Sequence, residues 1–420
     1  MWDVIVIGAG AAGLIAAARA AERGRSVLLL EKNRKPGVKI LMSGGTRCNI
    51  THATDAKGII AAYGTQGRFL HSALAALSPQ DVIELFHAEG VLTKVEETGK
   101  VFPVSDRALD VQQALLRRLA RTHAELKTEC AVTEIRQTEA GQFAVVCESP
   151  QDPHGVAVSG GEYLAANLIL TTGGKSYPGC GTTGDGYVWA SQLGHAIVPP
   201  RPALVPLVSP AEWIRNLSGV TLPDVVLKIF LAGQQKPLTQ CRSSLLFTHV
   251  GLSGPAALNV SRTVSGTIQA GEFRLNCDFL PDRTEATLLD EFAAAARNRG
   301  HSTAFACCTE WLPRRVIETL FGLVELSLTR KCAELSKAER QRLVQALKRQ
   351  DIPLTGTLGF EKAEVTAGGV ALSEVDSRTM QSKLIPKLFF AGEILDLDGP
   401  IGGYNFQAAF STGWLAAENV

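Results

Sequence analysis

The sequence of 420 residues lacks any CxxC motif, although it contains nine scattered cysteines. An odd number without paired spacing argues against a disulfide framework and a zinc site, and predicts reduced thiols in a cytoplasmic protein. No apolar run approaches the roughly 20 residues that a membrane-spanning helix requires. Charge of either sign is not in excess, since 42 Lys and Arg face 41 Asp and Glu. This balance predicts that neither nucleic acid nor a membrane surface is a partner.

The composition is that of an ordinary soluble globular protein, with 45% hydrophobic and 20% charged residues. The length predicts two or three domains. The chain opens with a complete βαβ unit, DVIVIGAGAAGLIAAARAAERGRSVLLLEK, over residues 3–32. A short apolar strand leads into a Gly-rich turn, an Ala-rich helix follows, and a second strand ends at Glu31.

Each glycine of the GxGxxG turn has a physical role in binding a dinucleotide. Gly8 permits the tight turn, Gly10 lets a pyrophosphate approach the backbone, and Gly13 lets the helix pack against the strand. The helix N-terminus favours the phosphate charge. Glu31 is placed to accept hydrogen bonds from the adenosine ribose, and its charge would repel a 2′-phosphate. The unit therefore predicts dinucleotide binding, with FAD and NAD both left open.

The next stretch, KNRKPGVKILMSGGTRCNIT over residues 32–51, favours FAD. A second Gly pair so soon after the ribose acid suggests a loop that lies along an extended ligand. Ser43, Arg47 and Asn49 supply donors for phosphate or ring oxygens. The alternative interpretation is a surface loop.

The last residues contain a second Gly-rich turn before a closing helix. A strand over 388–391 is followed by Gly392-Glu393, an acidic loop and Gly402-Gly403. We expect Asn405 to be the N-cap of the helix. The first N–H groups, near Asn405 and Phe406, would then face the pyrimidine edge of a flavin and stabilise its negative charge. The alternative is a structural helix with an Asn cap.

Eight blocks spread along nearly the whole chain carry a family resemblance. They are IGAGAAG (7–13), KILMSGGTRCNIT (39–51), KVFPVSDRA (100–108), TTGGKSYPGCGTTGDGY (171–187), LLFTHVGLSGPAAL (245–258), VTAGGV (365–370), TMQSK (379–383) and AGEILDLDGPIGGYNFQAAFSTG (391–413). Together they resemble the BaiN/YhiN-like flavoproteins, described as NAD(P)/FAD-dependent oxidoreductases or aminoacetone oxidase family FAD-binding enzymes. One characterised relative reduces steroid-ring double bonds in bile-acid metabolism.

The resemblance implies an α/β fold, in which a Rossmann-like, glutathione-reductase-type FAD domain is interrupted by an inserted domain. It also implies that the backbone of Val132 meets the adenine. Thr46 departs from the family pattern SGGGRCN, and a β-branched residue restricts the backbone there. The residues predicted to bind FAD are Gly8, Gly10, Ala11, Ala12, Gly13, Glu31, Lys32, Lys39, Ser43, Gly44, Arg47, Asn49, Val132, Gly392, Glu393, Gly403, Asn405 and Phe406.

We place the discontinuous FAD-binding domain at residues 1–195 and 355–420. Strand-like runs dominate 128–166. The insertion is predicted to be β-rich over 196–283, with a strand over 267–279, and helical over 284–354. The second GxGxxG, at 179–184, is interpreted as a turn before a helix, because no ribose acid follows it.

The predicted function is an FAD-dependent oxidoreductase of a small molecule, with NADH or NADPH as a transiently bound electron donor. A tRNA-modifying enzyme and a flavin-binding redox sensor are the alternatives. His249 and Arg47 are candidate catalytic residues, although a hydrogen-bonded structural histidine also explains His249. No metal site is predicted, and the sequence predicts no oligomeric state.

Overall fold

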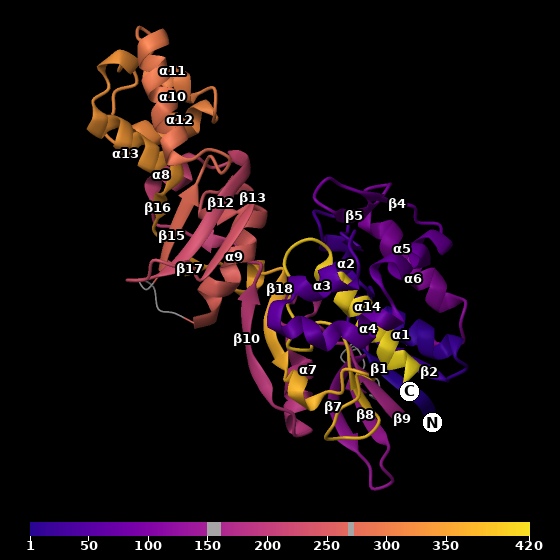
Figure 1. The fold of residues 1–420 in the computed structure, drawn as a ribbon. Helices are drawn as coiled ribbons and strands as arrows, with labels where there is room; N and C mark the ends of the chain where they lie inside the picture. Colours follow the sequence, from indigo (N-terminus) through magenta and orange to yellow (C-terminus); the bar gives the residue numbers. More distant parts are fainter. Residues whose placement is uncertain (149–160, 268–272) are drawn as a thin grey trace, which may run out of the picture. The chain divides into compact units, whose positions relative to one another are not determined.

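The computed structural model describes residues 1–148, 161–267 and 273–420, and the chain divides into two compact units (Figure 1). Unit 1 consists of Met1–Pro202 and Phe360–Val420, and unit 2 consists of Ala203–Gly359. The boundaries expected from the sequence lie a few residues N-terminal of these divisions. Residues 149–160 and 268–272, which interrupt the strand-like runs predicted over 128–166 and 267–279, lie outside the described residues.

Unit 1 is built on a sheet with strand order β6-β2-β1-β9-β8-β7, in which β19 also pairs with β9. Strands β6, β2, β1, β9 and β19 run parallel, whereas β8 pairs antiparallel with both β9 and β7. The strands are β1 (Trp2–Ile7), β2 (Val27–Leu30), β6 (Glu125–Lys127), β7 (Ala131–Gln137), β8 (Phe143–Glu148), β9 (Glu162–Leu170) and β19 (Leu388–Phe390). Because β1 and β2 are apolar and buried on both faces, they lie at the centre of the sheet.

Helices and two small sheets complete unit 1. The helices are α1 (Ala11–Glu22), α2 (Val38–Met42), α3 (Ala56–Ala62), α4 (His71–Ala76), α5 (Pro79–Ala88), α6 (Ala108–Ala120), α7 (Asp185–Gln192) and α14 (Tyr404–Glu418). Strands β3 (Thr51–His52), β5 (Lys100–Pro103) and β4 (Thr93–Val95) form one small sheet, and β10 (Ile197–Ala203) pairs with β18 (Val365–Val370). The short 3₁₀ helices are η1 (Gly64–Leu70), η2 (Pro178–Cys180), η4 (Phe360–Lys362) and η5 (Leu372–Glu374).

The first and last long helices of the chain pack side by side, as Figure 1 shows for α1 and α14. Small residues allow the close approach, since a Cβ at Gly413 would lie 2.5 Å from the carbonyl oxygen of Ala12. At the other end of α14, the Glu418 carboxylate lies 2.6 Å from the guanidinium groups of Arg19 and Arg23. The C-terminal segment is therefore part of the core that begins at residue 4.

Unit 2 combines an antiparallel sheet, of order β16-β15-β12-β13-β14-β11-β17, with a helical part. The strands are β11 (Leu207–Val208), β12 (Thr221–Leu231), β13 (Thr239–Phe247), β14 (Gly251–Ser253), β15 (Phe273–Asp278), β16 (Gln350–Ile352) and β17 (Gly356–Thr357). The helices are α8 (Glu212–Asn216), α9 (Gly254–Thr267), α10 (Glu285–Asn298), α11 (Ala304–Cys308), α12 (Arg314–Leu323), η3 (Cys332–Glu334) and α13 (Lys337–Lys348).

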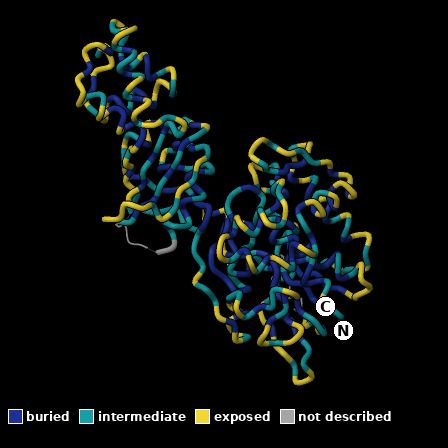
Figure 2. Tube along the Cα trace, viewed as in Figure 1, coloured by how far each residue is buried: buried dark blue, intermediate teal, exposed yellow. Residues whose placement is uncertain are grey.

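The helix α9 was not predicted within 196–283, the part of the insertion expected to be β-rich. Its residues Ala256, Ala257, Val260 and Val264 are buried at helical spacing against β12 and β13. The Gly254-Pro255 pair obscures this pattern, although proline is favourable in the first turn of a helix. Each unit has its own buried core (Figure 2). Among the helices of the described residues, none combines the length and apolar character needed to cross a membrane.

Candidate functional site

The first glycine turn joins β1 to α1 and leaves open space at one position. Gly8 has φ +100°, and a Cβ at Gly13 would lie 1.8 Å from the carbonyl oxygen of Gly8. Both positions therefore require glycine for reasons internal to the protein. By contrast, a Cβ at Gly10, the N-cap of α1, would have no protein atom within 4 Å. The N-terminus of α1 is accordingly open toward a ligand, as binding of a pyrophosphate requires.

Glu31 follows β2, and its side chain accepts a hydrogen bond from the backbone of the first glycine turn. Its Oε2 accepts the backbone N–H of Ala9 at 2.8 Å, and its Oε1 accepts that of Asn33 at 2.8 Å. The residue is only 8% exposed, and burial is the main cause that raises the pKa of its carboxyl group. A carboxylate has about four acceptor sites, so these two bonds leave capacity for a ribose. The sequence did not predict that Glu31 would accept these two backbone hydrogen bonds.

We expect Glu31→Ala to lower FAD retention, because the N–H groups of Ala9 and Asn33 would lose their acceptors. Each buried unpaired N–H costs about 1–3 kcal/mol, and the turn would loosen. The measurement is the FAD content per protein, read from absorbance after gel filtration. Glu31→Gln serves as the conservative control, since it keeps one carbonyl acceptor. Equal FAD content in Glu31→Ala and the wild type would show that Glu31 contributes nothing to the cofactor site.

The second glycine turn lies against the first. Gly392, directly after β19, has φ +78°, and a Cβ there would lie 2.9 Å from the Cβ of Ala12 in α1. The N–H of Gly392 donates to the Thr412 hydroxyl of α14 at 2.9 Å. Segments almost four hundred residues apart in the sequence thus meet at the N-terminal end of α1.

The N-terminus of α14 corrects one prediction. The N-cap is Gly403, with φ +90°, and Asn405 lies within the first turn. A Cβ at residue 403 would lie 2.4 Å from the carbonyl of Thr51, so only glycine fits. The Asn405 side chain instead holds the preceding loop, because it accepts from the N–H of Gly399 at 2.8 Å and donates to its carbonyl at 3.0 Å. The first-turn N–H groups, including that of Phe406, have no acceptor within the helix.

Asn49 provides a direct test of whether a flavin fits beside α14. Its Oδ1 atom is buried and has no hydrogen-bond partner in the described part of the chain. This atom lies 2.8 Å from the position that a Cβ at Gly403 would occupy, next to the start of α14. A buried acceptor without a donor is costly unless a ligand supplies an N–H. The pyrimidine edge of a flavin carries such an N–H, so these residues fit the cofactor.

The loop between α2 and β3 is held in an unusual backbone conformation. Gly44 and Gly45 have positive φ, and so do Thr46 at +70° and Cys48 at +59°. Ser43 caps α2, with its hydroxyl donating to the carbonyl of Ile40 at 2.8 Å. The exposed Thr46 therefore adopts the left-handed conformation natural to glycine, the residue that the family pattern has there.

We expect Thr46→Gly to stabilise the protein slightly. Removing the side chain from the left-handed conformation stabilises the folded state by about 1–2 kcal/mol. Glycine also gives the unfolded chain more conformational freedom, which lowers the stability by about 0.4–1 kcal/mol. The net gain in the free energy of unfolding is then about 0.5–1 kcal/mol, measured by urea denaturation. Gly45→Ala, at φ +67° with open space around its Cβ, is the matched reverse change and should destabilise. A loss of stability in Thr46→Gly would contradict this account.

Lys39 of α2 and Glu393 of the second glycine turn form an ion pair of 2.7 Å. Glu393 also accepts from the Ser176 hydroxyl at 2.9 Å and from the N–H of Thr366 at 2.8 Å. Four separate stretches of the sequence therefore meet at one carboxylate. Lys32 is paired elsewhere, with Asp185 at 2.7 Å.

Arg47 lies in the same loop, and its guanidinium is engaged by protein groups. Its Nη1 lies 2.7 Å from Glu96 and 3.3 Å from Asp106, and the guanidinium stacks 3.9 Å from the ring centre of Phe102. The hydrogen bond that Arg47 donates to the Glu96 carboxylate is the main cause that raises the pKa of Arg47. These contacts fix the loop on the small sheet. Donation from Arg47 to a ligand stays a prediction.

Val132 lies in β7, two residues after Cys130, whose N–H donates to the carbonyl of Glu31 at 2.9 Å. The strand that carries Val132 therefore begins next to Glu31, and contact of Val132 with an adenine stays a prediction. His249 lies in unit 2, in the turn between β13 and β14. It is exposed, and its ring makes no hydrogen bond to the described residues, so its catalytic role and its structural role both stay predictions.

Sequence reasoning missed a cluster of aromatic residues at the head of α14. Tyr404, the first residue of the helix, stacks on His52 with ring centres 4.6 Å apart and 20° between the planes. The Tyr63 hydroxyl donates to the Tyr404 carbonyl at 3.0 Å. The Tyr404 hydroxyl has no partner among the residues described, and burial raises its pKa. The sequence signal that could have predicted a role for Tyr404 is its position directly after Gly402-Gly403.

Comparison with known proteins identifies relatives that match this chain end to end. The HI0933-like protein Rossmann domain family matches residues 2–419. A ribosomal RNA dihydrouridine synthase of Escherichia coli (strain K12) is 36% identical over 423 residues, which covers 100% of this chain and 98% of the relative. A protein of the same name from Haemophilus influenzae is 33% identical, covering 99% and 98%. A 3-dehydro-bile acid delta(4,6)-reductase of Clostridium scindens is 30% identical, covering 98% and 97%.

Solved structures share the fold at low sequence identity. The Mycobacterium smegmatis Sdh1 complex in the apo form has a TM-score of 0.51 at 17% identity, covering 100% of this chain and 67% of that one. A 3-ketosteroid delta1-dehydrogenase from Sterolibacterium denitrificans, in complex with 1,4-androstadiene-3,17-dione, has a TM-score of 0.51 at 15% identity, covering 99% and 98%.

These matches confirm the predicted fold class, an α/β structure with a Rossmann-like domain. They support FAD as the cofactor and an oxidoreductase activity, and they identify neither the substrate nor the electron donor. The predicted family is likewise confirmed, and the chain belongs to the HI0933-like Rossmann family, the flavoprotein family that its sequence blocks resemble.

Proposed function

We propose that the protein is an FAD-dependent reductase that converts a uridine of ribosomal RNA to dihydrouridine, with NADH or NADPH as the electron donor. The observation that carries the proposal is the end-to-end match to two relatives named ribosomal RNA dihydrouridine synthase, at 36% and 33% identity. The even charge of the chain predicted no nucleic-acid partner. Net charge reports only a sum, however, and does not exclude a local basic surface.

The chemistry is the saturation of a polarised double bond. In uracil, the C5=C6 bond is conjugated to the C4 carbonyl, so a hydride adds at C6 and a proton at C5. FAD held at this site would supply the hydride chemistry, with NADH or NADPH as the source of the two electrons. The name of the bile acid reductase describes double bonds conjugated to a 3-oxo group, which is the same class of bond. A common active site for both reactions needs a proton donor beside the flavin.

We assign that proton donor to Tyr404. Stacking on His52 fixes its ring at the head of α14, and its hydroxyl is not used by any described residue. Because burial raises its pKa above the usual value near 10, the phenol holds its proton at neutral pH. The first-turn N–H groups of α14 and the Asn49 carbonyl would hold the pyrimidine edge of the flavin nearby.

The cofactor would extend from α14 toward α1. Gly10 and the N-terminus of α1 would take the pyrophosphate, and Glu31 the adenosine ribose. Since the Glu31 charge disfavours a 2′-phosphate, these residues suit FAD, and the nicotinamide donor would bind only transiently. Gly392 would allow close approach of the backbone where the two turns meet.

A small-molecule enone is the second candidate substrate, favoured by the 30% identical bile acid reductase. One experiment separates the two. The purified protein is incubated with NADH or NADPH and unmodified transcripts of the two large ribosomal RNAs, and nucleosides are analysed by mass spectrometry. A gain of two hydrogens on uridine supports the proposal. Absence of dihydrouridine together with reduction of a 3-oxo-Δ4 steroid would overturn it in favour of the enone.

A further inference from the structure

The helical part of unit 2, residues 285–349, carries a positive charge that the whole-chain balance hides. Residues 297–349 contain eleven Lys and Arg against five Asp and Glu. Within this stretch α13 packs on α10 and α12 through one face, where Leu343, Val344 and Leu347 are buried. The helix also contacts β15 and β16, and Lys337, Gln341 and Gln345 on its opposite side are exposed. Its other face is therefore available to a partner.

The exposed face of α13 bears cations and amides without a carboxylate. The exposed residues on it that can donate hydrogen bonds are Lys337, Gln341, Arg342 and Gln345, and the exposed Arg349 follows as the C-cap. Arg349 forms an ion pair with Glu285, whereas Lys337 and Arg342 have no ion-pair partner among the described residues. The one acid of the helix, Glu339, is turned to its N-terminus, where it accepts from the N–H of Ser336 at 2.7 Å.

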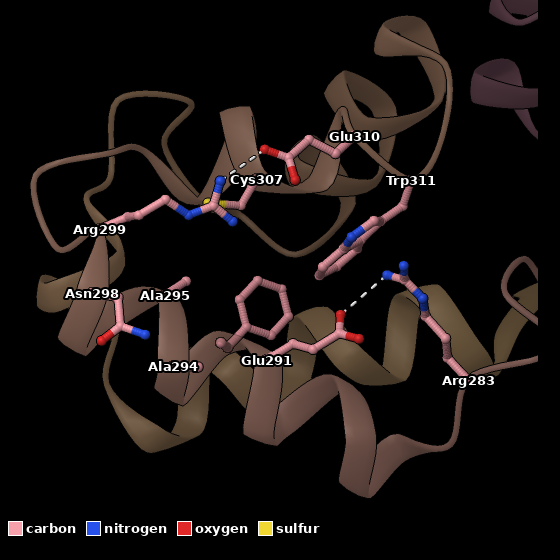
Figure 3. Close-up of a pocket in the computed structure, with 10 residues that line it drawn as sticks. Arg283, Glu291, Ala294, Ala295, Asn298, Arg299, Cys307, Glu310 and Trp311 are labelled. Carbon is pink, nitrogen blue, oxygen red and sulfur yellow. Dashed lines mark hydrogen bonds and ion pairs between the residues drawn. The ribbon is translucent and has the colours of Figure 1, made fainter.

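A pocket in the same helical part, shown in Figure 3, contains arginines that are all paired with carboxylates. It has a volume of about 300 Å³ and lies between α10 and Trp311. Its arginines are neutralised, since Arg283 lies 3.1 Å from Glu291 and Arg299 lies 2.9 Å from Glu310. The pocket therefore offers no uncompensated charge to an anion, and the face of α13 does.

We propose that the exposed face of α13 docks on the phosphate backbone of RNA. Lysine, arginine and glutamine are the side chains that contact phosphate and sugar oxygens without reading sequence. The absence of a carboxylate on this face removes the repulsion that a mixed surface would give. The inference deepens the proposed function, on which it rests, because it separates a docking surface in unit 2 from the chemistry in unit 1.

The test compares two double variants of the holoenzyme with matched charge changes. Lys337→Gln with Arg342→Gln neutralises the α13 face, and Lys57→Gln with Lys387→Gln neutralises two exposed lysines of unit 1. Binding to an unmodified large-subunit ribosomal RNA transcript is measured by filter retention from 50 to 200 mM salt. We expect the α13 variant to bind about tenfold more weakly, with a salt slope smaller by about 1.5. The unit 1 variant should bind like the wild type.

The controls separate this inference from the proposed function. Glutamine is a good helix former, so α13 should persist, which circular dichroism checks. Oxidation of NADH or NADPH without RNA should be unchanged. Equal weakening by both variants, or no weakening by either, would overturn the docking surface even if dihydrouridine forms. Loss of RNA binding only in the α13 variant, without dihydrouridine from any protein, would keep the surface and reject the proposed reaction.

Discussion

Gly10→Ala is expected to yield a folded protein that no longer retains FAD. A Cβ at this position meets no protein atom within 4 Å, and the backbone is in an ordinary region at φ −79°. The fold should therefore be unaffected. The added methyl group would occupy the space that the pyrophosphate needs at the helix N-terminus. We expect the dissociation constant for FAD to rise about 100-fold, which corresponds to about 2.7 kcal/mol.

Gly13→Ala is the matched comparison for this prediction. Here a Cβ would lie 1.8 Å from the carbonyl oxygen of Gly8 and 2.6 Å from the Thr171 hydroxyl, so α1 must move away from β1. Overpacking of this kind costs about 1–3 kcal/mol or more, and the apoprotein itself should unfold at lower temperature. The measurements are thermal unfolding of both apoproteins and titration with FAD. Normal FAD affinity in Gly10→Ala would mean that the pyrophosphate lies elsewhere.

Tyr404→Phe should leave the flavin bound and nearly abolish reduction of the substrate. The change removes one hydroxyl that no described residue uses, and the ring can still stack on His52. Loss of a general acid lowers turnover by about 10²–10⁴-fold. The measurement is dihydrouridine formed per minute at saturating NADH or NADPH, beside the rate of flavin reduction in the absence of RNA. Flavin reduction should be unchanged, because it needs no proton from Tyr404.

Tyr63→Phe provides a control within the same cluster. Its hydroxyl is already engaged with the Tyr404 carbonyl, so its loss should shift the position of the helix start and lower turnover only modestly. If Tyr404→Phe turns over at the wild-type rate, another group or water delivers the proton, and the assignment fails. If both variants lose activity equally along with FAD, the cluster has only a structural role.

The N-terminal βαβ unit could be predicted from sequence because its signals are local. Gly8, Gly13 and Glu31 lie within one short segment, and each follows from the geometry of a strand, a turn or a helix. The extra role of Glu31, bonded to the N–H of Ala9, depends on a backbone approach that no spacing reveals. Arg47 shows the same limit, because its partner Glu96 is 49 residues away.

The start of α14 was misjudged for a related reason. An asparagine near a helix start is usually an N-cap, and that preference predicted Asn405. The tertiary structure overrides it, since the Thr51 carbonyl leaves room only for glycine at residue 403, two positions earlier. The same close contact between Gly403 and residues 49–51 places Asn49 beside the start of α14, where Tyr404 lies. Long-range contacts of this kind have no trace in local composition, whereas the family blocks did mark the segments that meet.

The pairing of α1 with α14 also sets a condition on biosynthesis. During translation α1 is made almost four hundred residues before α14, so the two helices can pack only after all the intervening segments have been made. On the proposed assignment, the residues that would bind the adenosine half of FAD are therefore made long before those that would hold the flavin ring. If the start of α14 holds the flavin as proposed, cofactor capture has to follow the synthesis of α14. Loss of the last turn of α14, which carries the Glu418 contacts to Arg19 and Arg23, should then lower FAD retention.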